Sequence, residues 1–150
     1  MYLLNQAANG LMKSLQSVLA RHKVTAKQYT VLTIVRNRQP ISSAELSRRF
    51  FVTQQSMIEV VSGLEKSGFL GRAEDPSNRR ILEVRLTDKG LRLVEECESV
   101  MDSFEAEAFG VLSKAQLRTL REVLRLLLDD VRVRQSNDAD SARAARSGTG

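Results

Sequence analysis

The sequence predicts a mainly α-helical protein with a small β-hairpin wing: a winged helix-turn-helix carried between long terminal helices. Three observations support this fold class. A short helical pattern and a longer amphipathic one, separated by only two residues, occupy positions 42–67. A strand-turn-strand pattern follows directly over residues 69–86. Long apolar stripes of helical spacing lie near both ends of the chain.

Composition is that of an ordinary single-domain globular chain. The 150 residues fit one domain, and 42% hydrophobic with 27% charged residues is typical of soluble proteins. No apolar run reaches the length of about 18 residues that a membrane span needs, and the first residues lack the basic-then-apolar order of a signal peptide. The single cysteine excludes an intramolecular disulfide and suits a reducing cytoplasm.

The basic charge is concentrated in the middle of the chain. The net charge is +5 and the pI is near 9.8. Residues 21–92 hold 14 Lys and Arg against 7 Asp and Glu, whereas the remainder holds 9 against 11. Such a cluster suits a polyanion, because each neutralised phosphate releases counterions. A solvated basic surface with no partner is the alternative interpretation.

The first two helices are predicted from apolar periodicity and a capping signal. Residues 2–21 carry a helical stripe over five turns, and this face must be buried against something. Thr25 and Gln28 have capping-box spacing, and the helix they open should end near Arg38, before Pro40. The stripe of the first helix consists of Leu4, Ala7, Ala8, Leu11, Met12, Leu15, Val18 and Leu19.

The helix-turn-helix is predicted from a short helix followed by a longer one. Ser42 and Glu45 have capping-box spacing and open a short helix to Phe50. Thr53 is a good N-cap for the longer helix, and Gly68 stands where a left-handed cap should end it. In such a motif the second helix enters the DNA major groove.

Two strands and two further helices complete the prediction. The strand-like runs 69–73 and 81–86 enclose the turn-forming segment 74–80, which ends in two arginines. Thr87 should cap a helix over 88–108 whose exposed side is acidic and would repel phosphates. After Gly110, another capping-box spacing at Ser113 and Gln116 opens a helix with a leucine stripe.

The terminal helices offer more apolar surface than a small DNA-reading core can cover, so self-association is expected. We therefore predict dimerisation helices at 1–24 and 108–134, and a winged helix-turn-helix lobe with a long connecting helix at 25–107. Residues 135–150 contain no large apolar residue and are expected to form a disordered tail.

Three segments carry a likeness to a known family: P-I-S-S-A-E-L-S-R-R-F from Pro40, V-S-G-L-E-K-S-G-F-L from Val61, and D-P-S-N-R-R-I-L-E-V-R-L-T-D-K-G over 75–90. With the order of elements they resemble the MarR (multiple antibiotic resistance regulator) family of bacterial transcription factors, over roughly nine tenths of the chain. The resemblance implies an obligate homodimer, joined by its first, fifth and sixth helices, with two winged helix-turn-helix lobes.

The resemblance also implies roles for the wing arginines. The family's wing-tip arginine, seven residues before the strand-ending threonine, reaches the minor groove; here it is Arg80. Where the family usually has an acidic residue two positions earlier, this chain has Asn78, and Asp75 is near enough in sequence to substitute. Arg79 and Arg72 are expected to contact phosphates.

The longer helix of the helix-turn-helix offers candidate base contacts. Gln54 and Gln55 lie in its first turn, where recognition helices touch bases, and a glutamine amide pairs bidentately with adenine N6 and N7. The alternative is a solvated helix surface without contacts. Further candidate DNA contacts on this helix are Ser56, Ile58, Glu59 and Lys66, and candidate phosphate contacts are Ser42, Ser43, Arg48 and Thr53.

The sequence shows no catalytic constellation, so an enzyme is disfavoured and no cofactor is expected. His22 and Cys97 are each the only residue of their type, and a Cys-His nucleophile would need a third, orienting group. A metal site would need three or four clustered ligands, so none is predicted. Cys97 is expected to be a small core residue rather than a redox sensor.

The resemblance implies control by a small aromatic or phenolic anion, bound between the dimer helices and the DNA-reading lobe. His22, Tyr29 and Arg36 could line that crevice. The expected function is that of a dimeric, sequence-specific transcriptional regulator, a repressor acting on a pseudo-palindromic operator in double-stranded DNA. The alternative is a winged helix that docks onto another protein without a DNA function, whose binding added salt would hardly weaken.

Overall fold

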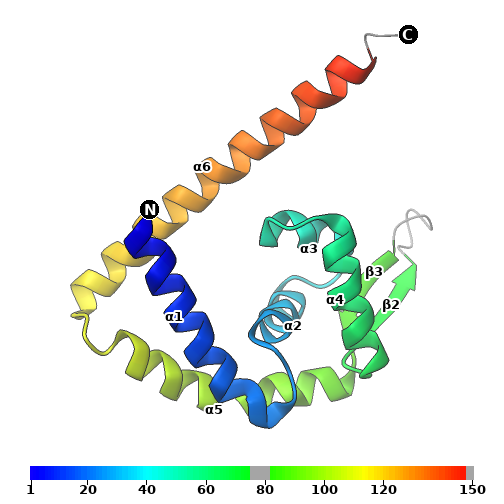
Figure 1. Ribbon diagram of the computed structural model, residues 1–150. Helices are drawn as coiled ribbons and strands as arrows, with labels where there is room; N and C mark the ends of the chain where they lie inside the picture. Colours follow the sequence, from blue (N-terminus) through cyan, green and yellow to red (C-terminus); the bar gives the residue numbers. More distant parts are fainter. Residues whose placement is uncertain (75–81, 148–150) are drawn as a thin grey trace. The chain divides into compact units, whose positions relative to one another are not determined.

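The computed structural model describes residues 1–74 and 82–147. The chain divides into two compact units, Met1–Ala108 and Phe109–Gly150. The expected fold class is confirmed: helices dominate, with one small antiparallel sheet. The elements up to the boundary are α1 (Tyr2–Leu19), the short 3₁₀ helix η1 (Ala20–His22), α2 (Ala26–Arg38), β1 (Ile41–Ser42), α3 (Ser43–Phe50), α4 (Gln54–Lys66), β2 (Leu70–Glu74), β3 (Leu82–Leu86) and α5 (Asp88–Phe109) (Figure 1).

The N-terminus of α2 is closed by three side-chain hydrogen bonds. The predicted capping box is confirmed, since Thr25 Oγ1 accepts from the Gln28 amide at 3.1 Å and Gln28 Oε1 accepts from the Thr25 amide at 2.8 Å. In addition, Gln16 Oε1 of α1 accepts from the backbone amide of Ala26 at 2.9 Å. The first helix therefore caps the helix that leads into the helix-turn-helix.

Gly68 ends α4 as predicted. Its φ of +74° is the left-handed conformation that a glycine adopts without a Cβ penalty. The amide of Phe69 donates to the carbonyl of Leu64 at 2.9 Å, and the amide of Gly68 donates to that of Glu65 at 2.8 Å. These bonds satisfy carbonyls at the end of the helix and turn the chain directly into β2.

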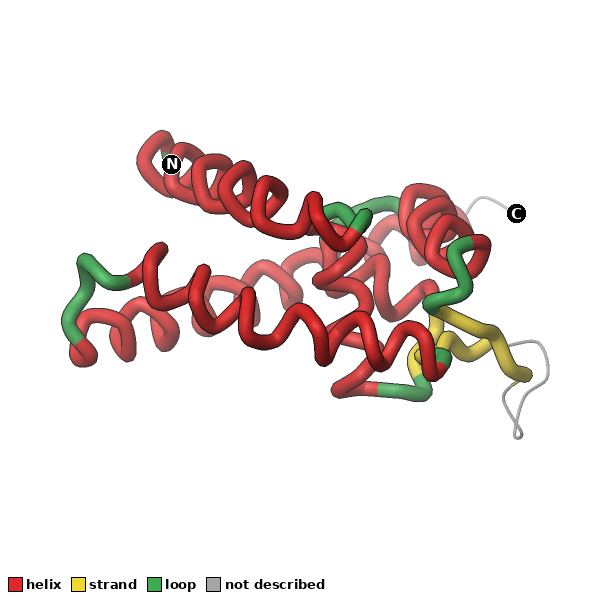
Figure 2. Tube along the Cα trace, turned by 90° about the horizontal axis from the view of Figure 1, so that it is seen from below, coloured by secondary structure: helices red, strands yellow, loops and turns green. Residues whose placement is uncertain are grey.

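The sheet has the strand order β1-β3-β2, and both pairings are antiparallel. The predicted hairpin is confirmed, with Leu70 opposite Leu86 and Glu74 opposite Leu82. The third strand, β1, pairs Ile41 with Val84. Two residues are too few for an alternating pattern to reveal a strand, so the sequence did not show this pairing. Figure 2 shows the strands of this sheet in yellow.

One apolar core runs through the first unit. The periodicity of Met57, Val60, Val61 and Leu64 predicts an apolar face on α4, and this face lies in the core. The C-terminal end of α1, most of one side of α2 and the first half of α5 pack with it. Burying each Leu or Met side chain contributes about 1.5–3 kcal/mol. Among the described residues, the largest fully buried side chains are Leu19, Val31, Leu32, Val35, Leu46, Met57, Leu64, Val61, Val84, Val94 and Cys97.

The start of α5 is packed against the turn after α4. Thr87 Oγ1 caps the helix by accepting from the Gly90 amide at 3.1 Å, as predicted, and donates to the carbonyl of Gly68 at 2.6 Å. A Cβ at Gly90 would lie 2.1 Å from the carbonyl oxygen of Phe69, so only glycine fits there. Lys89 Nζ reaches the carbonyl of Ser67 at 2.8 Å and lies 4.8 Å from the Phe69 ring centre.

The second unit contains α6 (Lys114–Ser147). The predicted capping box at its start is confirmed: Ser113 Oγ accepts from the Gln116 amide at 3.3 Å, and Gln116 Oε1 accepts from the Ser113 amide at 2.9 Å. The structure differs from the predicted disorder of residues 135–150, because the helix continues to Ser147. Alanine and arginine are good helix formers, and the first helix-breaking residue after 135 is Gly148.

Within the part of the chain that the structure describes, no helix combines the length and the apolarity that crossing a bilayer requires.

Candidate nucleic-acid interface

The turn between α3 and α4 is short and sharply defined. Phe51 takes the left-handed conformation, with φ of +52°, and its amide donates back to the carbonyl of Arg48 at 3.4 Å. The amide of Val52 donates to the carbonyl of Ser47 at 3.2 Å. The turn therefore fixes α4 relative to α3, which is what a helix-turn-helix needs to present its second helix.

Both helices of the motif begin at a hydroxyl-bearing cap. Ser42 Oγ accepts from the Glu45 amide at 3.1 Å, and Thr53 Oγ1 accepts from the Ser56 amide at 3.1 Å. Each hydroxyl proton is then still free to be donated outward, and each helix N-terminus carries partial positive charge. Ser42, Ser43 and Thr53 thus lie at two positions suited to phosphate oxygens.

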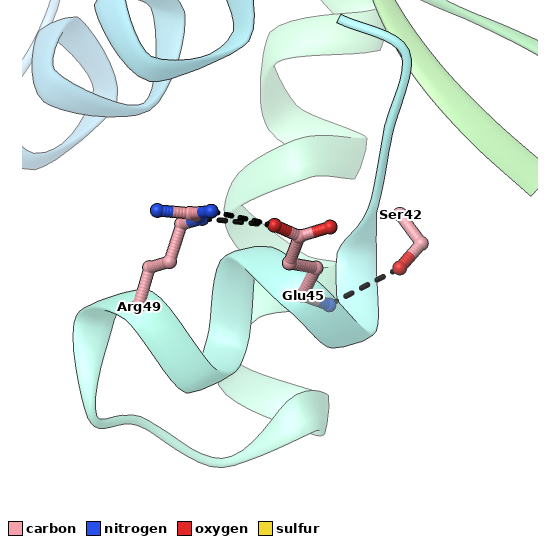
Figure 3. Close-up of polar contacts among 3 residues, drawn as sticks. All are labelled: Ser42, Glu45 and Arg49. Atoms are coloured by element: carbon pink, nitrogen blue, oxygen red, sulfur yellow. Dashed lines mark hydrogen bonds and ion pairs between the residues drawn. The ribbon is translucent and has the colours of Figure 1, made fainter. Parts of the chain in front are cut away.

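The capping box predicted at the start of α3 is only half formed. Ser42 caps the helix, but the Glu45 carboxylate does not return to the Ser42 amide. It accepts instead from Nε and a terminal nitrogen of Arg49, at 3.1 and 2.7 Å (Figure 3). Charge-assisted hydrogen bonds to a guanidinium are stronger than one to a neutral amide, which explains the exchange of partners.

The polar face of α4 is exposed and the apolar face is buried. Gln54, Gln55, Glu59 and Lys66 are exposed, and Ser56 and Ile58 are partly exposed. On the opposite side, the helix is anchored in the core by Met57, Val61 and Leu64. Among the described residues of this polar face, one side-chain hydrogen bond is present: Gln55 Nε2 donates to Glu59 Oε1 at 3.4 Å. The candidate base contacts therefore share one solvent-facing surface.

The wing arginines are in different situations. Arg72, on β2, was expected at a phosphate, but its Nε lies 2.8 Å from Glu65 Oε1 on α4. This ion pair holds the base of the wing against α4 through Nε, and the phosphate contact of Arg72 stays a prediction. Arg79 and Arg80, together with Asn78 and Asp75, lie outside the described residues.

Arg48 and Arg49, neighbours on α3, provide a matched pair for testing phosphate contact. Arg48 is exposed, whereas Arg49 is held by Glu45. In a plot of log affinity against log salt concentration, we expect Arg48→Ala to make the slope less negative by about 0.9 for each copy of the residue on the duplex. That value corresponds to the counterions released by one phosphate contact. Arg49→Ala should leave the slope nearly unchanged. Titrations at four or more salt concentrations measure both; an unaltered slope for Arg48→Ala would exclude the contact.

The three candidate effector-binding residues differ in exposure and in their contacts. His22 ends η1 and is partly exposed, and Tyr29 is buried in α2. Burial, with smaller contributions from Cys97 and Glu98, raises the pKa of the Tyr29 phenol. Arg36 forms an ion pair with Glu98 of α5, and this hydrogen bond raises the pKa of the guanidinium. An anionic effector at Arg36 would therefore have to compete with Glu98.

A cavity of about 400 Å³ lies elsewhere in the first unit, between α1 and the end of α5. None of His22, Tyr29 or Arg36 contributes to its walls. Its lining is Leu11, Ser14, Ser17, Val18, Phe104, Glu107 and Ala108.

Cys97 is a core residue, as predicted. Its side chain is fully buried, and burial together with the charge of Glu96 raises the pKa of the thiol. A buried thiol with a raised pKa has little reactive thiolate. Across residues 1–74 and 82–147, no three His, Cys, Asp or Glu side chains are grouped closely enough to hold a metal ion.

The residues that position the interface were missed at the level of sequence. Glu65 holds Arg72, Lys89 ties α5 to the end of α4, and Glu45 holds Arg49. Only the last pair has a sequence signal, the four-residue spacing of opposite charges on a helix. The other two contacts join residues of different elements, and the local sequence pattern does not predict them.

The short α3, the fixed turn, the exposed polar face of α4 and the adjoining three-stranded sheet define a winged-helix DNA-binding protein. Comparison with known proteins leads to the same class. The sequence profile of the MarR family matches residues 24–82. The HTH-type transcriptional repressor Rv2887 of Mycobacterium tuberculosis is 30% identical over 129 residues, which are 86% of this chain and 93% of that protein. The chain belongs to the MarR family of transcriptional regulators.

Solved structures share the fold. BpsR of Bordetella bronchiseptica, whose DNA binding is regulated by 6-hydroxynicotinic acid, is 27% identical with a TM-score of 0.77, over 85% of this chain and 91% of that one. A MarR variant of Escherichia coli in complex with operator DNA is 23% identical with a TM-score of 0.78, over the same 85% and 91%. These similarities confirm the winged helix-turn-helix, and the relatives are regulators rather than enzymes.

Proposed function

We propose that this chain is a dimeric repressor that binds a pseudo-palindromic operator in the cytoplasm. The observation that carries the proposal is the solvent-facing polar side of α4, set beside the wing sheet on a capped helix-turn-helix. The repressor name of the Mycobacterium tuberculosis relative supports the direction of regulation. The proposed base contacts are Gln54, Gln55, Ser56 and Ile58, and the proposed backbone and minor-groove contacts are Ser42, Ser43, Arg48, Thr53, Lys66, Arg72, Arg79 and Arg80.

The exposed apolar side chains of α1 and α6 support dimerisation. Tyr2 and Leu3 of α1 are 73% and 79% exposed in the single chain, and α6 exposes a further apolar stripe. A second copy would bury these surfaces. Residues 1–24 and 108–134 would then join the protomers, and residues 25–107 of each would form a reading lobe. A twofold dimer presents two copies of α4, so its operator should be pseudo-palindromic.

Selection of bound duplexes from random DNA tests this function. We expect an inverted repeat with half-site centres about 10 base pairs apart, since two recognition helices of a dimer enter successive major grooves. Deletion of the gene should raise transcription from a promoter that contains the selected site. Enrichment of an unpaired half-site, or lower transcription after deletion, would contradict the dimeric repressor.

We further propose that a small aromatic or phenolic anion releases the repressor from DNA. The regulation of BpsR by 6-hydroxynicotinic acid supports this proposal, and Arg36 with Tyr29 and His22 supplies the groups that would bind such an anion. Because Glu98 already occupies Arg36, removal of its charge should favour the effector.

Glu98→Gln is therefore expected to raise the affinity for hydroxylated aromatic acids several-fold, whereas Arg36→Ala should abolish their effect on operator binding. Isothermal titration against 6-hydroxynicotinic acid and salicylate measures the first effect, and DNA-shift assays measure the second. Glu96→Gln serves as the control, because Glu96 is an exposed carboxylate two residues away that forms no ion pair among the described residues. Equal affinities for wild type and Glu98→Gln would show that Arg36 does not bind the effector.

A further inference from the structure

Gln55 and Glu59 are joined on the exposed face of α4. They are one helical turn apart, both are exposed, and Gln55 Nε2 donates to Glu59 Oε1 at 3.4 Å. A carboxylate only accepts hydrogen bonds, so this contact determines which end of the glutamine amide faces Glu59. We propose that Glu59 is a positioning residue that orients Gln55 for adenine and does not itself bind a base. The inference rests on the proposed function, because it requires α4 to lie in the major groove.

The chemistry of the amide gives the preferred base. Nε2 carries two hydrogens, and one of them is used by Glu59. The other hydrogen and the carbonyl oxygen Oε1 remain available to DNA. Adenine offers the matching pair in the major groove, the N7 acceptor and the N6 donor, whereas guanine offers two acceptors, N7 and O6. With its amide held in this orientation, Gln55 meets a donor and an acceptor at adenine, but its oxygen opposes an acceptor at guanine.

The charge of Glu59 provides a second, independent signature. Among the described residues, Gln55 is the hydrogen-bond partner that the structure records for Glu59, and no cation within 4.0 Å neutralises it. An uncompensated carboxylate beside phosphates lowers affinity for every duplex. Glu59 therefore improves discrimination between bases at the cost of general affinity, and its removal should change the two quantities in opposite directions.

The experiment compares four variants of the full chain: Gln55→Ala, Glu59→Ala, Glu59→Gln and the double variant Gln55→Ala/Glu59→Ala. The first probe is the duplex selected from random DNA by the wild-type protein. The second is a set of duplexes in which each half-site position is changed in turn to each of the other base pairs. The third is an unrelated duplex of the same length. Competition binding gives the preference at each position and the affinity for unrelated DNA.

Gln55→Ala should lower the preference for A·T at one position of each half-site by about tenfold, the discrimination of one good bidentate contact. Glu59→Ala should lower the preference at the same position at least threefold while binding unrelated duplex more tightly. Glu59→Gln, which keeps an acceptor but loses the charge, should share the tighter general binding and retain most of the preference. In the Gln55→Ala background, Glu59→Ala should change discrimination no further.

Three results overturn the inference and leave the proposed function standing. The first is a loss of preference at a different position in Glu59→Ala, which would indicate that Glu59 reads cytosine N4 directly. The second is additive effects in the double variant. The third is an unchanged base preference in Gln55→Ala. Failure of the wild-type chain to bind any duplex at low salt would overturn the inference and the proposed function together.

Discussion

Leu127→Asp is expected to convert the proposed dimer into monomers and to weaken operator binding by on the order of 100-fold or more. Leu127 lies with Leu124 and Val131 on one apolar stripe of α6, where it is 50% exposed in the single chain, and an unpaired carboxylate there would be buried by the partner. Separate protomers lose the gain in affinity that comes from linking two half-site contacts, which is commonly 10²–10⁴. Analytical ultracentrifugation and DNA-shift titrations measure the two effects.

A control for this prediction is present on the same helix. Leu126→Asp makes the same chemical change one residue away, which is about 100° around the helix from Leu127 and on the side away from Leu124 and Val131. We expect it to remain dimeric and to bind DNA nearly as well as wild type. If Leu127→Asp also sediments as a dimer with unaltered DNA affinity, α6 does not join the protomers.

Gly90→Ala is expected to lower the free energy of unfolding by about 3 kcal/mol, the upper part of the usual range for overpacking. The added methyl group would lie 2.1 Å from the carbonyl oxygen of Phe69 and 3.0 Å from Leu86 Cδ2. Relief requires backbone movement at the junction of α4, the wing and α5, because the nearest atom belongs to the main chain. Urea denaturation monitored by circular dichroism measures the change.

Gly10→Ala is the matched control. Gly10 is also helical, but apart from its chain neighbours and the backbone of its own helix no atom lies within 4 Å of the position where its Cβ would be. The same substitution should therefore stabilise α1 by up to about 1 kcal/mol through helix propensity. Equal effects of the two substitutions would show that the close approach at Gly90 is not present in solution.

Local signals explain why so much of the fold could be predicted. The caps at Thr25, Thr53, Thr87 and Ser113 and the glycine stop at Gly68 depend on residues within a few positions of each other, and each is confirmed. The core face of α4 follows from periodicity alone. These features fix where helices begin, end and face the interior.

Contacts between distant elements explain most of what could not be predicted. The charge of Arg72 is visible in the sequence, whereas its pairing with Glu65 depends on how β2 leaves α4. In the same way, the sequence shows that Arg36 is a cation but not that it forms an ion pair with Glu98 of α5. The extension of α6 to Ser147 was missed for another reason: low hydrophobicity predicts disorder, but alanine-rich segments also have high helix propensity.

The hydrogen bond from the Ala26 amide to Gln16 joins two parts of the protein with different tasks. Gln16 belongs to the helix proposed to hold the subunits together, and Ala26 begins the helix that carries the chain into the reading lobe. Any rearrangement of the dimer contact that shifts α1 must either move α2 with it or leave the Ala26 amide of α2 without its acceptor. Because such coupling is reciprocal, binding of operator DNA then changes the affinity between the two subunits by the same factor by which the subunit contact changes the affinity for the operator.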